Sequence, residues 1–196
     1  MNVLLQPQHL TLGILAGGRA TRLGGIDKAW LERDGEPQVL RIVRALRPRM
    51  QAVLVSANAN LGRYARHGLS TVSDTIADIG PMGGLDALLR ACRTPWLLTV
   101  PVDVIDVSDG VVPTLVGHAA SKGSFAVDDD GRQPLLALWH VETARPATDA
   151  AISRADFSVH ALQDALAMSA ARLREGRVGN LNTPADLAAA GRRLRP

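Results

Sequence analysis

Short apolar runs alternate with segments of helical periodicity along this chain. Such runs, bounded by turn residues, are typical of buried strands. The expected strands are residues 10–15, 52–56 and 96–100, a weaker one at 71–73, and a pair at 124–127 and 135–140 joined by an acidic turn. Between the runs, apolar residues recur at the i, i+3, i+4 spacing of a helix face. The expected helices are 39–46, 61–67, 83–93 and 111–120.

Two more helices are expected toward the C-terminus. Residues 157–174 form one long periodic segment. Its inward positions are Leu162, Ala165, Leu166 and Leu173. A last helix opens at Thr183, because Thr183 can act as the N-cap and Pro184 suits the first helical turn.

The alternation of strands and helices predicts an α/β domain of the Rossmann-like, three-layer kind with a mostly parallel sheet. At 196 residues, without a repeat or a linker, the chain is expected to form a single domain. Ligands of such sheets bind beyond the carboxyl ends of the strands. A glycine loop after Leu15, the segment 56–58, Asp74 and Asp103 all come directly after expected strands. We therefore expect them to gather at one rim of the sheet.

The composition favours a protein that handles small anions. The chain is 46% hydrophobic and 21% charged, with a net charge of +3. This small excess does not indicate nucleic-acid binding, and an aromatic content of 3% argues against platforms on which bases stack. A modest positive surplus suits anionic substrates.

Cysteine, histidine and apolar content exclude several other classes. The single cysteine, Cys92, rules out an intrachain disulfide and a zinc site built from cysteines. Cys92 is spaced from Leu85, Leu88 and Leu89 as on one face of a helix, which predicts that its thiol is buried. The five histidines are scattered without metal-ligand spacing. No run approaches a membrane helix in length, and the first ten residues lack the pattern of a signal peptide. A cytoplasmic protein without a membrane partner is expected.

The segment 15–28 carries the strongest functional signal. It holds two glycine pairs together with Arg22 and Lys28, directly after a buried strand. Glycines let backbone N–H groups approach a ligand, and successive N–H groups form a concave anion site. The alternative is a flexible basic turn, but two glycine pairs around arginines favour phosphate binding. The loop matches neither the Walker pattern nor the dinucleotide-binding glycine pattern.

Two carboxylates at strand ends admit two interpretations each. Asp103 comes after a strongly apolar strand, where it can hold Mg²⁺ or cap a turn. Asp74 and Asn58 can hold a guanosine, because a carboxylate accepts hydrogen bonds from the N–H edge of guanine, or they can cap turns. Spacing alone leaves both questions open.

Three other polar or glycine-rich segments are equally ambiguous. Residues 80–84 (GPMGG) can admit a ligand to a helix start or simply form a turn. Asn180 and Asn182 suit recognition of a pterin or its phosphate, and equally an Asx turn before the last helix. The acidic triplet 128–130 is interpreted as a solvated hairpin turn rather than a cation site.

The sequence LAGG, followed by Arg22 and by Gly24-Gly25-Ile26-Asp27-Lys28, resembles the signature loop of the nucleotidyltransferases. In its detail it is similar to the molybdenum cofactor guanylyltransferases. The resemblance runs from about Leu12 to Leu187 and is thinnest between Glu142 and Gly176. It implies the nucleotide-diphospho-sugar transferase type of fold, with a nucleotide-binding part at about 10–105 and an acceptor-binding part at about 106–196.

The resemblance also implies roles for individual residues. Arg22, Lys28 and Asp103 would be catalytic, with Asp103 as the Mg²⁺ ligand. The nucleotide would be bound by Leu15, Ala16, Gly17, Gly18, Lys28, Ser56, Asn58, Asp74, Gly84 and Asp103, and the acceptor by Gln133, Asn180 and Asn182. Two positions depart from the family: Ser56 stands where relatives often carry Asn, and Ile105 stands where the family usually has Pro.

The implied reaction is transfer of GMP from GTP to the terminal phosphate of the molybdopterin cofactor, with release of pyrophosphate. The resemblance further implies contact with the preceding cofactor-assembly enzyme and with chaperones of recipient molybdoenzymes. CMP transfer to the same acceptor and nucleotide transfer to a sugar phosphate are alternatives, since base choice cannot be deduced from Asp74. A nucleotide-binding adaptor without catalysis is another, although the combination of Arg22, Lys28 and Asp103 argues against it.

Overall fold

A computed structural model describes residues 5–17, 27–105, 107–108, 110–174 and 178–179. Gly18, Arg22, Asn180, Asn182 and the helix expected from Thr183 lie outside the described residues. The roles expected of these positions stay predictions.

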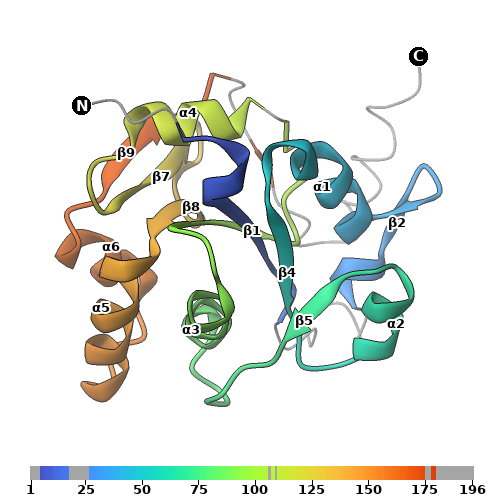
Figure 1. Cartoon of the computed structure of the whole chain (residues 1–196), viewed down its shortest axis with the longest axis horizontal. Helices are drawn as coiled ribbons and strands as arrows, with labels where there is room; N and C mark the ends of the chain where they lie inside the picture. Colours follow the sequence, from blue (N-terminus) through green and yellow to red (C-terminus); the bar gives the residue numbers. More distant parts are fainter. Residues whose placement is uncertain (1–4, 18–26, 106, 109, 175–177, 180–196) are drawn as a thin grey trace.

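A seven-stranded sheet forms the centre of the molecule, in the order β5-β4-β1-β6-β8-β7-β9 (Figure 1). All six expected strands are present, which confirms this part of the sequence-based prediction. The six are β1 (Leu10–Leu15), β4 (Ala52–Ser56), β5 (Ser70–Val72), β6 (Trp96–Pro101), β7 (Gly123–Asp128) and β8 (Gly131–His140). The seventh strand, β9 (Ser169–Arg172), was not expected.

The four strands β5, β4, β1 and β6 run parallel to one another. Leu15 at the end of β1 lies opposite Ser56 on one side and Pro101 on the other, so three strands end at the same level. The segments that leave these strands therefore share one edge of the sheet, as the alternation of strands and helices predicted.

The strand β8 runs against its neighbours and pairs with β6 and β7, while β9 pairs parallel with β7. The mostly parallel sheet is thus confirmed. The acidic residues 128–130 lie at the expected hairpin turn from β7 into β8, but Asp128 is buried, so the expectation of a solvated turn is wrong for this residue. In this hairpin Phe125 pairs with Ala137, but the next residue of β7, Ala126, pairs with Gln133. Residues 134–136 are therefore extra residues in β8 and form a bulge. Pro134 suits a bulge because it has no N–H to donate to the sheet.

Helices cover both faces of the sheet, which gives three layers (Figure 1). One buried core joins the sheet to α1, α2 and α4, and the other joins it to α3, α5 and α6. The first set is α1 (Gln38–Leu46), α2 (Leu61–Arg66) and α4 (Val111–His118). The second set is α3 (Pro81–Ala91), α5 (Val141–Ser153) and α6 (Val159–Ala165). The three-layer α/β fold is confirmed.

The prediction of a single long helix at 157–174 is wrong. The helix α6 ends at Ala165, Ala167 takes a left-handed backbone conformation with a φ of 51°, and the chain continues as β9. The alanine-rich sequence of 169–172 has high helix propensity, but pairing beside β7 prevails. From Ala170 to Leu173 exposed and buried residues alternate, as they do in a strand.

A small hairpin precedes α1. Its strands β2 (Glu32–Arg33) and β3 (Glu36–Pro37) are joined by Asp34 and Gly35, whose φ angles of 53° and 77° are those of a type I′ turn. Short 3-10 helices lie at η1 (Pro7–His9), η3 (Lys28–Trp30) and η4 (Arg47–Arg49). The hairpin carries the chain from Lys28 to the start of α1.

Cys92 is buried and free, as its helical spacing predicted. Within the described residues, no helix combines the length and the apolar character needed to cross a bilayer. The same residues contain no group of three or more His, Cys, Asp or Glu side chains that could hold a metal.

Asp128, buried at the end of β7, anchors the chain at Val178. Its carboxylate accepts hydrogen bonds from the Val178 N–H (3.0 Å), the Gln133 amide (3.0 Å) and the Asp130 N–H (2.9 Å). Burial alone would raise the pKa of this carboxyl, but the hydrogen bonds from Val178, Gln133, Asp130 and Gly131 outweigh it and leave the pKa below its usual value.

Replacement of Asp128 with asparagine is expected to lower the free energy of unfolding at neutral pH by about 1–3 kcal/mol, since charge-assisted hydrogen bonds are lost. A carboxyl whose pKa is lowered by folding stabilises the protein above its unfolded pKa, and this contribution is lost as the pH falls through the folded value. Urea unfolding at several pH values checks this. The difference between the two proteins should shrink below pH about 3.9, and a difference that stays constant would contradict the assignment.

Candidate active site

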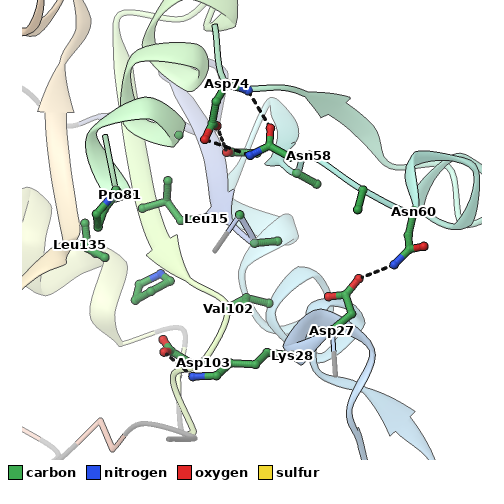
Figure 2. Close-up of a pocket in the computed structure, with 18 of the residues that line it drawn as sticks. Leu15, Asp27, Lys28, Asn58, Asn60, Asp74, Pro81, Val102, Asp103 and Leu135 are labelled. Atoms are coloured by element: carbon green, nitrogen blue, oxygen red, sulfur yellow. Dashed lines mark hydrogen bonds and ion pairs between the residues drawn. The ribbon is translucent and has the colours of Figure 1, made fainter. Parts of the chain in front are cut away.

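A cavity of about 780 Å³ opens at the carboxyl ends of the parallel strands. Its lining comes from the segments after β1, β4, β5 and β6, from the start of α3 and from Leu135 of β8. Figure 2 shows Asp74 and Asn58 at one end of this cavity and Lys28 and Asp103 at the other. The cavity therefore has two polar ends, separated by apolar side chains such as Leu15 and Val102.

At one end, Lys28 Nζ lies 3.2 Å from Asp103 Oδ2. The two residues are 75 positions apart and come from η3 and from the turn after β6. Their side chains are 25% and 29% exposed, so both charged groups remain accessible from the cavity. A pair this exposed contributes little to stability, and the accessible charges suit a ligand that carries phosphate groups.

Asp103 fits a Mg²⁺ ion. Mg²⁺ prefers one or two carboxylates together with phosphate oxygens and water, rather than a complete protein cage. A single accessible carboxylate at the edge of a cavity provides this donor set, and an ammonium group beside it would face the same phosphates. The Asp103 carboxylate would hold the ion, and Lys28 would contact the ligand's phosphate oxygens.

Asp27, directly before Lys28, is fixed from two sides. One carboxylate oxygen accepts the Ala29 N–H (3.1 Å) and the other accepts the Asn60 side-chain amide (3.0 Å). The first contact caps the 3-10 helix η3, and the second links this helix to the segment after β4. Asp27 therefore orients Lys28 from the preceding position.

At the other end, the Asp74 carboxylate is held by two side chains from the end of β4. Ser56 Oγ donates to Asp74 Oδ1 (3.2 Å), and Asn58 Nδ2 donates to Oδ2 (3.0 Å). The Asn58 oxygen in turn accepts the backbone N–H of Asp74 (2.9 Å). Each carboxylate oxygen retains a lone pair, so Asp74 can accept further hydrogen bonds from a ligand.

Glycines at the start of α3 bring this helix against the same carboxylate. A Cβ at Gly84 would lie 2.7 Å from Ser56 Oγ and 2.9 Å from a methyl of Leu15, and one at Gly83 would lie 3.1 Å from Asp74 Oδ2. Any side chain at Gly84 would displace Ser56 or Leu15. These glycines are needed for the close approach of helix and sheet.

The fold and this geometry can be compared with known proteins. The model of the MobA-like NTP transferase domain matches residues 12–170. Molybdenum cofactor guanylyltransferase from Yersinia pseudotuberculosis serotype O:1b (strain IP 31758) is 32% identical over 188 residues, covering 93% of this chain and 94% of that protein. The protein of the same name from Serratia proteamaculans is 39% identical over 139 residues, covering 70% and 71%.

The chain belongs to the MobA-like NTP transferase family. It is a nucleotidyltransferase, and the resemblance drawn from the glycine loop is confirmed. Solved structures agree on the fold. Molybdopterin-guanine dinucleotide biosynthesis protein A from Archaeoglobus fulgidus superposes with a TM-score of 0.73 at 17% identity, covering 93% of this chain and 97% of that one. The 2-C-methyl-D-erythritol 4-phosphate cytidylyltransferase from Thermus thermophilus gives 0.67 at 16% identity, covering 92% and 96%.

Most residues expected to bind the nucleotide line this cavity of the MobA-like transferase. They are Leu15, Ala16, Gly17, Lys28, Ser56, Asn58, Asp74, Gly84 and Asp103. Of the residues expected to bind the acceptor, Gln133 is described, and its amide donates to Asp128 rather than lining the cavity. Leu135, two residues further along β8, does line it.

Sequence reasoning assigned no role to several residues of the lining. Asp27, Asn60 and Tyr64 belong to this group, while Leu135 was expected nearer the acceptor as part of the segment 133–135. Asp27 carried a usable signal, because an aspartate two residues before a buried Ala29-Trp30 pair is a common cap. Asn60 has a left-handed backbone with a φ of 56°, and Leu135 lies in a bulge. Neither feature is visible in a hydrophobic pattern.

Tyr64 lies at the cavity and is 1% exposed. Its burial, helped by the negative charge of Asp27, raises the pKa of its phenol to about 12. It is the sole tyrosine of the chain, so tyrosinate absorbance reports on it alone.

We expect this absorbance to appear near pH 12 in the folded protein, rather than near 10. Because the pKa is higher in the folded state, the stability that neutral Tyr64 provides is present below pH about 10 and is lost as the pH rises toward 12. An alkaline titration followed by absorbance and circular dichroism checks this. Tyrosinate forming near pH 10 in a protein with a native spectrum would contradict it.

Proposed function

We propose that this transferase moves GMP from GTP to the terminal phosphate of the molybdopterin cofactor and releases pyrophosphate. The observation that carries the proposal is the cavity with two polar ends, one with the Lys28–Asp103 pair and one with the carboxylate of Asp74. The names of the relatives from Yersinia and Serratia support the choice of guanine nucleotide and molybdenum cofactor.

The Asp74 end supports recognition of guanine. The N1–H and exocyclic amine of guanine are two adjacent donors, and an ionised carboxylate accepts two hydrogen bonds from such an edge. Ser56 and Asn58 already fix the orientation of this carboxylate. A serine at position 56 therefore preserves a hydrogen-bond donor where relatives often carry asparagine.

The Lys28 end supports the transfer step. An oxygen of the acceptor phosphate forms a bond to the α-phosphorus of GTP, the bond from that phosphorus to the β-phosphate oxygen breaks, and pyrophosphate leaves. The acceptor is already an anion, so no general base is needed. The barrier arises largely from repulsion between two anions, and fixed positive charge lowers it.

In this mechanism Lys28 offsets charge on the phosphates, and the backbone N–H of Gly17 can add a donor. Arg22 is expected to add a second cation. Bound Mg²⁺ would supply further charge neutralisation and orient phosphate oxygens. Asp103 would hold the ion, and Asp27 would keep Lys28 directed toward the phosphates.

The positions of the lining residues along the chain support the same proposal. Apart from Leu135, the described residues that line the cavity lie between positions 15 and 103. This agrees with a nucleotide-binding part at about 10–105. The acceptor would then be held by residues from about 106 onward, including Gln133, Asn180 and Asn182.

Pyrophosphate release in the presence of the molybdopterin acceptor and Mg²⁺ tests the proposal. We expect release with GTP and a much slower rate with CTP, because cytosine does not present two adjacent donors to Asp74. If pyrophosphate were released faster with CTP than with GTP, the reaction would be CMP transfer and not GMP transfer. Binding of GTP without any release would instead indicate a nucleotide-binding adaptor.

A further inference from the structure

Two buried polar side chains contact the turn that comes after Asp103. Arg33 and Gln38 are 3% and 1% exposed. Arg33 Nη1 donates to the Ile105 carbonyl (2.6 Å), and Gln38 Nε2 donates to the Val104 carbonyl. Two consecutive carbonyls of one turn are thus bound by side chains from β2 and from the first residue of α1.

Backbone hydrogen bonds complete this arrangement. The Ile105 N–H donates to the Gly179 carbonyl (3.1 Å), and the Val104 N–H donates to the Pro101 carbonyl (3.3 Å). Both peptide groups after Asp103 are therefore bound. An isoleucine at position 105 has an N–H to donate, which proline would lack.

The segment that supplies these side chains also carries Lys28. It begins with Lys28, which contacts Asp103, and ends with Gln38, which contacts Val104. Trp30 is buried within it, and the Gln38 N–H donates to the Leu31 carbonyl (2.9 Å). The segment 28–38 and the turn 103–105 thus meet through three side chains, which sets the position of the ammonium group relative to the carboxylate.

Burying polar side chains at this place in the core carries a cost. Val39, Ile42 and Val104 are all buried in the core beside α1, and apolar side chains would fill such space without the cost of removing a guanidinium and an amide from water. The hydrogen bonds to Val104 and Ile105 offset that cost. Their common target is the turn that presents Asp103.

We propose that Arg33 and Gln38 are positioning residues that hold the Asp103 carboxylate in place for a nucleotide-bound divalent cation. The inference deepens the proposed function and rests on it for the identity of the ligand. The claim about the turn itself can be tested on the protein without ligand.

The first experiment measures amide hydrogen exchange across residues 101–108 of the ligand-free protein. Arg33→Met and Gln38→Met each remove a donor while keeping a side chain of similar length in the core. We expect exchange to accelerate by about tenfold in each variant, since a released turn opens more often. Ser124→Ala is the matched control, because Ser124 is also buried and donates to a backbone carbonyl, that of Leu115 (2.7 Å). Unchanged exchange at 101–108 in both methionine variants would overturn the proposal, whatever the enzyme's reaction.

The second experiment compares GTP binding by calorimetry with and without Mg²⁺. Loss of a group that orients a metal ligand typically costs 10–100-fold in metal affinity or activity. Mg²⁺ should raise the affinity of the wild-type protein for GTP. In both methionine variants we expect this increase to be at least about tenfold smaller, while the affinity for GTP without Mg²⁺ stays near that of wild type. Arg33→Lys keeps a donor and should restore part of the increase. Ser124→Ala should retain all of it.

The two experiments separate the possible failures. Faster exchange with an unchanged Mg²⁺-dependent increase in GTP affinity would mean that the contacts only stabilise the fold, which overturns the positioning role. An equal loss of affinity with and without Mg²⁺ would overturn it as well. If the wild-type protein binds GTP with Mg²⁺ but transfers nothing to the pterin, the proposed function is wrong. The exchange and binding measurements would still decide whether Arg33 and Gln38 position Asp103.

Discussion

The variant Asp103→Asn is expected to lower the rate of the proposed GMP transfer by at least about a hundredfold. Asparagine nearly matches aspartate in shape and can still accept a hydrogen bond from Lys28, so the turn after β6 should keep its structure. The change removes one negative charge from the end of the cavity that also holds Lys28. A neutral amide is a poor ligand for Mg²⁺ compared with a carboxylate, and the phosphates of GTP would lose their bound ion.

Single-turnover pyrophosphate release at saturating GTP measures this loss, with thermal unfolding as the check on folding. Asp129→Asn is the control, since Asp129 is ion-paired with Arg172 at the β7–β8 turn and is not part of the cavity lining. The control should behave as wild type. If Asp103→Asn released pyrophosphate as fast as this control, the carboxylate would have no part in the reaction.

The variant Lys28→Met is expected to reduce turnover by about a hundredfold, with a small effect on stability. Lys28 is one quarter exposed, and its pair with Asp103 is too accessible to contribute much to folding. Its ammonium group would offset charge that develops between the α-phosphate and the departing pyrophosphate. Methionine keeps the apolar stem of the side chain and removes only the charge, so a lower rate would report on electrostatics.

The chain offers a close control, because Lys122 is the one other lysine in the sequence. Lys122 is exposed beside β7 and outside the cavity lining. Lys122→Met should leave turnover unchanged. In wild type, GTP with Mg²⁺ should slow acylation of Lys28 by a lysine-specific reagent and leave Lys122 as reactive as before. Equal protection of both lysines, or of neither, would contradict a phosphate contact at Lys28.

The strands and the edge that carries the site could be predicted from sequence because each depends on local pattern. The runs at 10–15, 52–56 and 96–100 are apolar enough to be recognised alone, and parallel strands place the segments after them at one edge. Asp74 and Asp103 could therefore be assigned to the same edge of the sheet from the sequence alone.

Features that depend on distant partners could not be predicted. The helix α5 at Val141–Ser153 contains Pro146 and shows only a weak apolar stripe. The strand β9 is alanine-rich and takes its form from β7. The burial of Arg33 and Gln38 is explained by carbonyls of Val104 and Ile105, far away in the sequence. In each case the deciding contact lies outside the window in which a sequence pattern can be recognised.

The reversed direction of β8 has a consequence for the shape of the open rim. Ala137 pairs with Thr99, so Leu135 stands level with the end of β6, and residues 131–134 extend past it together with the end of β7. Leu135 is the described residue of this ribbon that lines the cavity, and residues 131–134 are not among the described lining residues. A longer or shorter hairpin there would change how bulky a molecule can lie beside the triphosphate, while the phosphate-handling groups stayed where they are.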